Sequence, residues 1–516
     1  MQKILIFFLF TLIVMAQSVP TRLVKSDDGF SLTRNGKPFF IKGVGGKHDL
    51  EQLAAAGANS IRTWGADNID SILDDAHKNG LTVTIGFWLG HERHGFDYQK
   101  AEAVARQKEQ CRQAILKYRN HPALLMWAVG NEMEAAGTNP AIWYAVDDIA
   151  RMCKDLDPDH PTMTVIAEVW PEKIQAMNQF LRNIDVVGIN TYGGCPSIGQ
   201  RYREAGGHLP YVVTEFGPPG QWETGKTDWG APYEMSSTEK AAFYEKAYRE
   251  GVLEEKGLAL GSYAFLWGFK QEATATWYGL FLKDDSRTQA IENLTALWGG
   301  PAPENRAPRL SSIEASKTAD LQPGETITAS VQVSDPDGDE LKLSWILRRE
   351  SGLYATGGDD QPDQPEFPDA IQTANAGTCK VSMPESGGPY RLFLYAHDGK
   401  GCAAVANIPL KVEGPVKPVT MHASKVPVAV YADGHGSDIW IPSGYMGNTG
   451  AISMDLQNTS QPAAGKTCIK VEFRAKEGWG GVVWQSPAND WGDQPGGRNL
   501  SAANVLRFQA KGELGD

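Results

Sequence analysis

The amino-acid sequence predicts an α/β protein in which a (β/α)8 barrel, the TIM-barrel architecture, is followed by two all-β sandwich domains. Strand-like and helix-like segments alternate from Phe39 to about residue 300. A proline-rich stretch follows, and the segments beyond it are short, alternating and strand-like. With 516 residues the chain is too long for one core, and a prior of about 150 residues per domain gives two to four domains.

Eight strand-like segments in the first half are apolar on both faces and rich in Val, Ile and aromatic residues, as a sheet covered on both sides requires. In chain order they are FFIKGVGG, NSIRTWG, LTVTIGFWLG, ALLMWAVGNE, PTMTVIAEV, DVVGINTYGG, YVVTEFG and LGSYAFLWGF. Helix-like segments lie between them, such as NIDSILDDAHKNG, AEAVARQKEQCRQAILKYRN, AIWYAVDDIARMCKDL and STEKAAFYEKAYREGVLEE. Eight strands with helical crossovers in roughly 260 residues match a (β/α)8 barrel, which we expect over residues 19–300. An open doubly wound sheet is the structural alternative, but no Gly-rich phosphate loop follows the first strand.

Residues 1–18, MQKILIFFLFTLIVMAQS, have the pattern of a secretory signal peptide. Lys3 precedes an apolar run, and small residues follow at Ala16 and Ser18. An uncleaved anchor is the alternative, but the apolar run is short for a membrane span of about 20 residues. No later segment of the sequence is long and apolar enough to cross a bilayer. We therefore expect a secreted or periplasmic protein that has no integral membrane span after signal cleavage.

The linker PAPENRAPRL separates the barrel from a β-rich region. Residues 301–414 contain TITASVQVSD, LKLSWILRRE, YRLFLYAHDG and CAAVANIPLKV, which predict a β-sandwich of immunoglobulin-like size. A second linker, EGPVKPVT, leads into another β-rich segment, residues 415–516, which stops just after VLRFQAKGE, so a truncated sandwich stays open. In this segment Trp479, Trp484 and Trp491 stand among Gly and Asn, which suits either a carbohydrate-binding sandwich or an ordinary core.

The charge and the cysteines narrow the possible functions. A net charge of −13 without a long run of one sign disfavours a general nucleic-acid binder, because phosphates would be repelled. The six cysteines lack CxxC or Cys/His metal spacing. Export permits disulfides, so Cys379 and Cys402 could pair, but buried free thiols are equally compatible. Asp335, Asp337 and Asp339 (SDPDGDE) could hold calcium, although such a run is more often a turn.

Two glutamates stand at the ends of expected barrel strands. Glu132 closes the apolar run of MWAVGNEME, the fourth strand, and Glu215 lies near the end of the seventh, YVVTEFG. Side chains at the C-terminal ends of barrel strands converge on one open mouth, where such enzymes place their active sites. The two strands are three β/α units apart, so the two carboxylates can face each other across that mouth.

Paired carboxylates suit the cleavage of a glycosidic bond, which needs a proton for the leaving oxygen and a negative charge beside the developing oxocarbenium ion. In retaining enzymes the two carboxyl groups lie about 5–5.5 Å apart, and one of them attacks to form a glycosyl-enzyme. The acid must be protonated near neutral pH, which burial or the charge of its neighbour can arrange. The structural alternative is that both glutamates are buried against Arg62 or a lysine.

These residues carry a family resemblance. WAVGNE on strand four and TEFG on strand seven resemble the paired signatures of the retaining glycoside hydrolases of clan A, and the best match is to the catalytic barrel of glycoside hydrolase family 2. The segments FSLTRNGKPFFIKGVGGKHD, SIRTWGADN, GINTYGG and WYGLFLKDD are also similar to that barrel. The resemblance covers about residues 28–300.

The resemblance implies roles for the residues at the barrel mouth. Glu132 would be the general acid/base and Glu215 the nucleophile. Asn131 would hydrogen-bond the sugar 2-hydroxyl, a contact that strengthens in the transition state. Tyr192, at the end of the sixth strand, would orient the nucleophile. Arg62, at the end of the second strand, would hold Glu215 ionised through its opposite charge, although it could instead be a structural ion-pair partner.

Aromatic side chains and a histidine complete the expected substrate-binding set. Trp267, at the end of strand eight, would supply an apolar platform for the sugar ring. Trp64, like Trp88 and Trp277, is a candidate for stacking on sugars, although aromatic residues also fill ordinary cores. His91 follows the third strand and could touch sugar hydroxyls, with a solvated loop histidine as the alternative.

The sequence therefore predicts a retaining glycosidase that hydrolyses O-glycosyl bonds of a β-linked polysaccharide or oligosaccharide, with no cofactor and no metal. In family 2 a jelly roll and a sandwich normally precede the barrel, whereas here the barrel follows the signal peptide almost directly. This layout is also similar to the β-1,3-glucanosyltransferases of family 72. A β-glucan transglycosylase that uses the same glutamates is thus one alternative, and a non-catalytic glycan-binding protein is the other. The sequence leaves open the sugar, the linkage, endo or exo action and the oligomeric state.

Overall fold

The computed structural model describes most of the chain from residue 18 onward. Within that range it leaves out residues 135–136, 353, 355–360, 362–363, 376, 417–427, 433–434, 437–439, 475–478, 487, 489–499, 501–502 and 513–516 and the side chains of residues 94, 432, 435 and 436. Nearly all of the expected signal peptide, and Trp491 of the last segment, lie outside the described residues.

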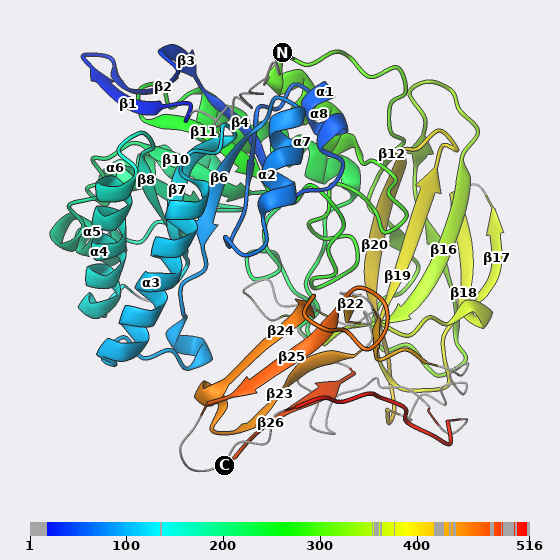
Figure 1. Cartoon of the computed structure of the whole chain (residues 1–516). Coiled ribbons are helices and arrows are strands. Elements are labelled where there is room, and N and C mark those ends of the chain that lie inside the picture. Colours follow the sequence, from blue (N-terminus) through cyan, green and yellow to red (C-terminus); the bar gives the residue numbers. More distant parts are fainter. Residues whose placement is uncertain are drawn as a thin grey trace, which may run out of the picture. The chain divides into compact units, whose positions relative to one another are not determined.

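Eight parallel strands close into a barrel, which confirms the predicted (β/α)8 fold (Figure 1). In order around the barrel they are β4 (Ile41–Gly45), β5 (Ser60–Arg62), β6 (Thr82–Phe87), β7 (Leu124–Asn131), β8 (Thr162–Ala167), β9 (Val186–Asn190), β10 (Tyr211–Phe216) and β11 (Ala259–Ala264). Seven of the strands fall within the segments expected from the sequence, and β11 begins one residue before its segment.

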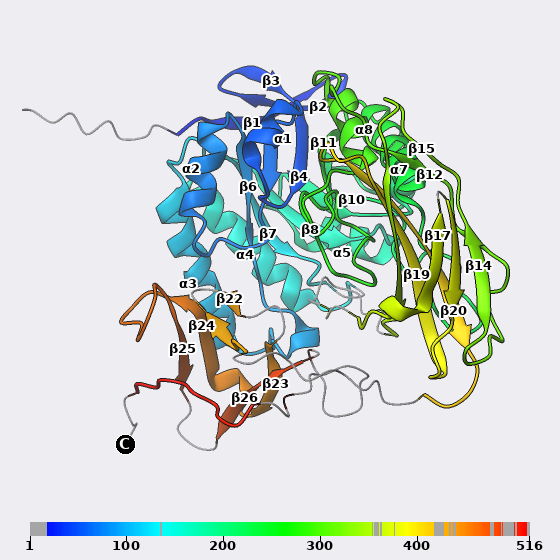
Figure 2. The same cartoon turned by 90° about the vertical axis from the view of Figure 1, so that its right-hand side faces the viewer.

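Helices connect the barrel strands, and in Figures 1 and 2 those such as α3 and α4 lie outside the sheet. They are α1 (Leu50–Ala55), α2 (Asp70–Lys78), α3 (Ala101–Tyr118), α4 (Pro140–Leu156), α5 (Pro171–Phe180), α6 (Ile198–Glu204), α7 (Ser237–Tyr248), continued by a π-helical turn (Arg249–Leu253), and α8 (Gln289–Trp298). Helix α4 shows why they form. The Asn139 side chain accepts a hydrogen bond from the Ala141 amide (3.0 Å) and caps its first turn, and Ile142, Val146 and Ile149 give it a buried face at helical spacing.

A three-stranded antiparallel sheet precedes the barrel and was not predicted from the sequence. It contains β1 (Thr21–Ser26), β2 (Gly29–Arg34) and β3 (Lys37–Phe39) and lies at one end of the barrel in both views (Figures 1 and 2). Leu32 of this sheet is 1% exposed and packs with Ile41, Leu125 and Val186, which lie at the starts of barrel strands. The sheet therefore closes the N-terminal end of the barrel and leaves the opposite end for a site.

The region after the proline-rich linker is all-β in its described residues, as predicted. One sheet has the order β13 (Glu314–Ala315), β14 (Thr326–Ser330), β18 (Thr378–Ser382) and β17 (Ile371–Asn375), and the other β16 (Lys342–Arg349), β19 (Gly388–His397) and β20 (Ala403–Val412). Ile327 and Val381 of the first sheet share a core with Leu347, Leu392 and Leu410 of the second, so the two sheets form a sandwich. A short pair, β12 (Arg309–Leu310) and β15 (Val333–Ser334), accompanies them.

The last segment contains antiparallel pairs in its described part. They are β21 (Tyr431–Ala432) with β22 (His435–Gly436), β23 (Ile441–Gly447) with β26 (Gly480–Gln485), and β24 (Ile452–Asn458) with β25 (Cys468–Phe473). Trp479 is 61% exposed, whereas Trp484 is half-buried in β26.

The chain divides into two compact units whose borders do not follow the linkers. The barrel unit holds the chain up to Gly217 with Phe243–Trp267 and Asn293–Ala302. The sandwich unit holds Pro218–Ala242, Gly268–Glu292 and the chain from Pro303 onward. Two connections that follow barrel strands, one after β10 and one after β11, thus belong to the sandwich unit. The residue boundaries expected for separate domains stay predictions.

Buried charges join these connections to the sandwich. Glu234, in the connection after β10, accepts hydrogen bonds from Lys240, Thr276 (2.8 Å) and Asn407 of β20 (2.7 Å). Arg391 of β19 is 1% exposed and donates to the carboxylate of Glu350 (2.8 Å) and to the Pro232 carbonyl (2.8 Å). Because buried charges are costly without partners, the two connections depend on the sandwich for their stability.

All six cysteines are free thiols, so the pairing considered for Cys379 and Cys402 is not formed, and both side chains are buried. No helix among the described residues is both long and apolar enough to span a bilayer.

Candidate active site

The end of β7 has an unusual backbone that presents the first glutamate. Gly130 has a φ of 80° and Glu132 a φ of 52°, both in the left-handed region. The positive φ of residue 130 favours glycine, and a Cβ atom there would also lie 2.0 Å from the end of the Met133 side chain. The Glu132 amide donates to the Val165 carbonyl of β8 (2.9 Å), which fixes this turn at the strand end. A non-glycine residue in this conformation is uncommon and is typical of functional sites.

Glu215 of β10 is held by three donors. Arg62 Nη1 (3.0 Å) and the Trp64 indole N–H (2.7 Å) donate to its Oε1, and the Tyr192 hydroxyl (2.9 Å) donates to its Oε2. The Arg62 side chain is 1% exposed and that of Glu215 is 8% exposed, so the ion pair is buried. A permanent positive charge and three hydrogen bonds stabilise a carboxylate anion at this position, as a nucleophile requires.

Glu132 lies in a different environment. The Asn190 side chain, at the end of β9, donates to its Oε1 (2.6 Å), and the Thr214 hydroxyl orients that amide by donating to Asn190 Oδ1 (2.7 Å). Burial, and secondarily the negative charge of Glu215, raise the pKa of Glu132 to about 7. One carboxyl group is therefore kept neutral up to about neutral pH beside another that forms a buried ion pair with Arg62.

Asn131 connects the two glutamates through one polar network. Its Oδ1 accepts from Arg62 Nη2 (2.6 Å) and from Asn190 Nδ2 (3.2 Å). Because Arg62 also binds Glu215 and Asn190 also binds Glu132, both carboxylates belong to a single cluster. The structure thus brings together Glu132, Glu215, Asn131, Arg62 and Tyr192, with Trp64 beside them.

The other two predicted binding residues lie near strand ends but differ from expectation in their surroundings. Trp267 follows β11, is 1% exposed, and its backbone N–H donates to the Gly45 carbonyl (2.8 Å). His91 follows β6, is 3% exposed and stacks on the ring of Trp88 at 4.9 Å. Neither ring offers an open face, because both are buried, and their roles toward a sugar stay predictions. Trp64 donates its indole N–H to Glu215, and its expected stacking on a sugar stays a prediction.

Sequence reasoning missed two groups at this end of the barrel. Asn190 lies in GINTYGG and carries the signal that singled out Asn131, a polar side chain at the end of a buried strand. Glu134 is buried and accepts from Lys173 Nζ (2.8 Å) and from the Ala167 amide (2.9 Å). This ion pair ties the loop after β7 to the end of β8 and the start of α5.

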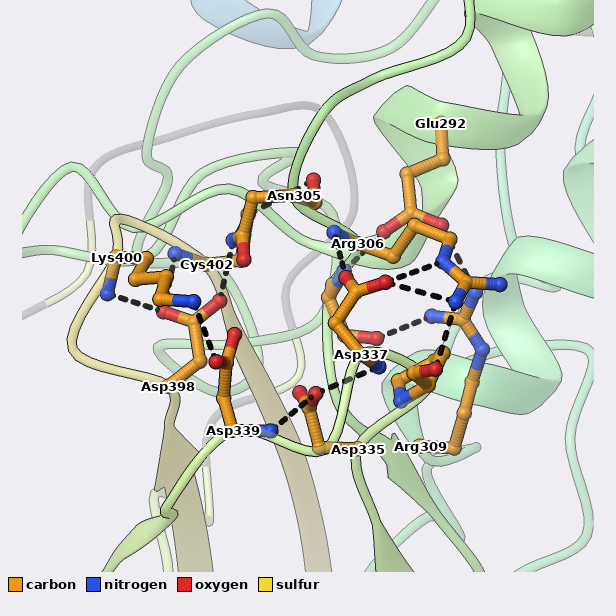
Figure 3. Close-up of polar contacts among 12 residues, drawn as sticks. Glu292, Asn305, Arg306, Arg309, Asp335, Asp337, Asp339, Asp398, Lys400 and Cys402 are labelled. Atoms are coloured by element: carbon orange, nitrogen blue, oxygen red, sulfur yellow. Dashed lines mark hydrogen bonds and ion pairs between the residues drawn. The ribbon is translucent and has the colours of Figure 1, made fainter.

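The acidic turn of the sandwich is a separate cluster (Figure 3). One carboxylate oxygen each from Asp335, Asp339 and Asp398 lies within 4.8 Å of the others. Oxygen donors of this kind suit a hard cation. Asp335 Oδ1, however, accepts from the amides of Asp337 and Asp339, as in a turn, and Lys400 Nζ donates to Asp339 (2.5 Å). Because the ammonium compensates part of this charge, we assign no metal site here.

Comparison with known proteins finds a family model that matches part of the barrel. Residues 31–218 match the domain described as "Glycosyl hydrolases family 2, TIM barrel domain". The β-glucuronidase of Streptococcus agalactiae is 24% identical over 264 residues, which cover 42% of this chain and 42% of that protein. The β-glucuronidase of Paenibacillus borealis is 26% identical over 199 residues, covering 34% of this chain and 32% of that protein. The chain thus spans less than half the length of these relatives.

Among solved structures, a β-glucuronidase from Faecalibacterium prausnitzii is similar with a TM-score of 0.43 and 19% sequence identity. The similarity covers 55% of this chain and 52% of that chain.

Proposed function

We propose that this chain, whose residues 31–218 match the TIM barrel domain of glycosyl hydrolases family 2, is a retaining glycosidase that hydrolyses O-glycosyl bonds of a β-linked glycan. The observation that carries the proposal is the contrast between Glu132 and Glu215. Both lie in one network at the C-terminal ends of β7 and β10, yet one is neutral up to about pH 7 and the other is paired with Arg62. A protonated carboxyl group beside a carboxylate that is paired with a cation is what acid-assisted nucleophilic displacement needs.

In the first step Glu215 attacks the anomeric carbon while Glu132 donates its proton to the glycosidic oxygen. The bond from the anomeric carbon to the leaving oxygen breaks, and a glycosyl ester of Glu215 forms. In the second step the Glu132 carboxylate takes a proton from water as the water oxygen attacks the same carbon. The ester bond breaks, Glu215 returns to its carboxylate form, and Glu132 is protonated again. Two inversions give net retention.

The surrounding residues support this sequence of steps. Both donors that reach Asn131 bind its Oδ1, which leaves the Asn131 Nδ2 group to donate to the sugar 2-hydroxyl. Arg62, Trp64 and Tyr192 fix both oxygens of Glu215, so the attacking atom is held in place before the substrate arrives.

The sugar is proposed from the relatives. Both β-glucuronidases named above act, by their names, on β-glucuronides, so aryl β-glucuronides are the first substrates to test. Aryl β-glucosides, β-galactosides and β-xylosides complete the panel, because sequence identity of 24–26% does not determine which sugar binds.

The decisive test compares Glu132→Gln and Glu215→Gln with a matched exposed variant, Glu172→Gln in the first turn of α5. We expect Glu215→Gln to lose turnover to background and Glu132→Gln to lose about 10²–10⁴-fold on poor leaving groups. Glu172→Gln should keep full activity. Unchanged turnover in either active-site variant would disprove the mechanism. Products longer than the substrate would indicate transfer to a sugar acceptor in place of water.

We also propose that the protein is exported after cleavage near residues 16–18, and that the sandwich after the linker is immunoglobulin-like. The apolar run after Lys3 and the two-sheet core support these proposals. N-terminal sequencing of protein recovered outside the cytoplasm tests the first. A mature chain that still begins at Met1 would contradict it.

A further inference from the structure

The two barrel strands that flank β7 each lead into an exposed tryptophan. Around the barrel, β7 pairs with β6 on one side and β8 on the other (Figure 1). Trp88 follows β6 directly and is 50% exposed, and Trp170 follows β8 by three residues and is 58% exposed. Glu132, at the end of β7, therefore has an exposed indole in the segment that follows the neighbouring strand on each side.

Exposure distinguishes these two residues from three buried aromatic residues near strand ends. Tyr192, Phe265 and Trp267 are 9%, 8% and 1% exposed. Their rings are part of the packed wall of the barrel, as their edge-on ring contacts also indicate for Tyr192 and Phe265. Trp88 and Trp170 instead present large apolar faces to solvent at the same end of the barrel.

Trp88 is held in a defined orientation beside the catalytic cluster. Its ring stacks on His91 with centroids 4.9 Å apart and an interplanar angle of 25°. The loop is fixed because the Gly90 amide donates to Gln107 (2.6 Å). A Cβ atom on Gly65 would lie 3.9 Å from Trp88 Cβ. Gly65 directly follows Trp64, whose indole binds Glu215, so Trp88 adjoins the active site.

Trp170 stands on an equally rigid base. It is the residue before Pro171 at the start of α5, and its carbonyl accepts from the Ile174 amide (3.2 Å). One turn later, Lys173 Nζ donates to Glu134 (2.8 Å) and to the Ala167 carbonyl (2.5 Å). The buried ion pair therefore locks the turn that carries Trp170 to the loop that follows Glu132.

We propose that Trp88 and Trp170 bind sugar rings of the leaving group, so that the natural substrate is an oligosaccharide or polysaccharide rather than a glycoside of a small alcohol. The proposal rests on the proposed function. The acid that protonates the leaving oxygen must stand on the leaving-group side of the broken bond, which places the leaving group next to Glu132. Indole faces stack on the apolar faces of pyranose rings, and rigid side chains lose little entropy on binding.

The test compares two substrates that share one glycosyl unit, identified by the panel above. The first is the glycosyl fluoride, which has no group beyond the broken bond, and the second is the corresponding β-linked trisaccharide. We expect Trp88→Ala and Trp170→Ala each to lower kcat/KM on the trisaccharide roughly tenfold, about 1.4 kcal/mol, and to change the fluoride less than twofold. Trp88→Phe and Trp170→Phe keep an aromatic face and should retain most of the activity.

A matched control is Tyr144→Ala, which removes a 61% exposed aromatic ring from the outer helix α4 and should change neither substrate. Equal losses on both substrates, or no loss on the trisaccharide, would overturn the proposal while leaving the glycosidase intact. If the wild-type protein hydrolyses neither substrate, the proposed function itself fails. Hydrolysis of the fluoride by the wild-type protein therefore distinguishes failure of the tryptophan proposal from failure of the proposed glycosidase function.

Discussion

Replacing Glu132 by Gln should stabilise the protein at alkaline pH, although it removes the proposed acid/base. Burial and the charge of Glu215 raise the pKa of Glu132 to about 7, from an ordinary value of 4.5 in the unfolded chain. Below pH 4.5 the carboxyl is protonated in both states. As the pH rises from 4.5 to about 7, the unfolded chain ionises while the folded protein does not, so folding stability is lost through this window and does not return above it.

The size of the effect follows from the two pKa values. A pKa about 2.5 above its ordinary value corresponds to about 3 kcal/mol of lost stability once both states are ionised. At pH 5 the loss is only about 1 kcal/mol, because the folded carboxyl is still protonated. Gln cannot ionise, and its amide oxygen can still accept from Asn190. The advantage of Glu132→Gln over wild type should therefore grow by about 2–3 kcal/mol from pH 5 to pH 9.

Thermal unfolding of both proteins at pH 5 and pH 9, followed through the transition of the barrel, measures this difference. The Tm difference between Glu132→Gln and wild type should be roughly 4–8 °C larger at pH 9 than at pH 5. Glu172→Gln, which removes an exposed carboxylate, serves as the control and should show no such change. A Tm difference between wild type and Glu132→Gln that is independent of pH would refute the claim that burial keeps this carboxyl neutral.

The remaining predictions concern the same end of the barrel. kcat/KM of the wild type should fall about tenfold per pH unit above pH 7, as Glu132 loses the proton it donates, and a profile flat to pH 9 would contradict that role. Tyr192→Phe removes a charge-assisted hydrogen bond and should lower kcat about tenfold with little change in Tm. Arg62→Lys supplies a point charge that cannot serve all three acceptors of the guanidinium, which are Thr214, Glu215 and Asn131, so kcat should fall ten- to a hundredfold. An unchanged kcat would show that the planar guanidinium is not needed. Lys173→Met leaves the buried Glu134 carboxylate without its cation and should lower the free energy of unfolding, measured in urea, by about 3–5 kcal/mol. The double variant Lys173→Met with Glu134→Leu should regain most of that free energy.

The barrel could be predicted because a strand buried on both faces leaves an unbroken apolar signature. Each of the eight expected segments corresponds to one strand of the closed barrel to within one residue, even β5, which has only three residues. The sheet β1–β3 escaped prediction because its strands are short and half-exposed, and its order comes from Leu32 packing beneath the barrel. Long-range packing of this kind leaves little trace in local pattern.

The site was predictable where charge interrupts an apolar strand end, as at Arg62, Glu132 and Glu215. Asn190 has a weaker form of the same signal, since a neutral amide at a strand end is common in any fold. The donation from Trp64 to Glu215 depends on how the loop after β5 turns, which residue spacing does not encode. The partnership of Lys173 and Glu134 likewise joins distant parts of the chain and needs three-dimensional coordinates.

The buried charges around Arg391 bear on how this protein can be divided. A fragment that ends at the proline-rich linker would keep Glu234 and Lys240 but lose Asn407, and the Pro232 carbonyl would lose its guanidinium donor. Side chains that are buried in the intact chain would then be exposed to solvent in the connections that follow β10 and β11. Excision at the linker should therefore give a barrel prone to aggregation, and dissection by truncation would need a cut that keeps β19 and β20.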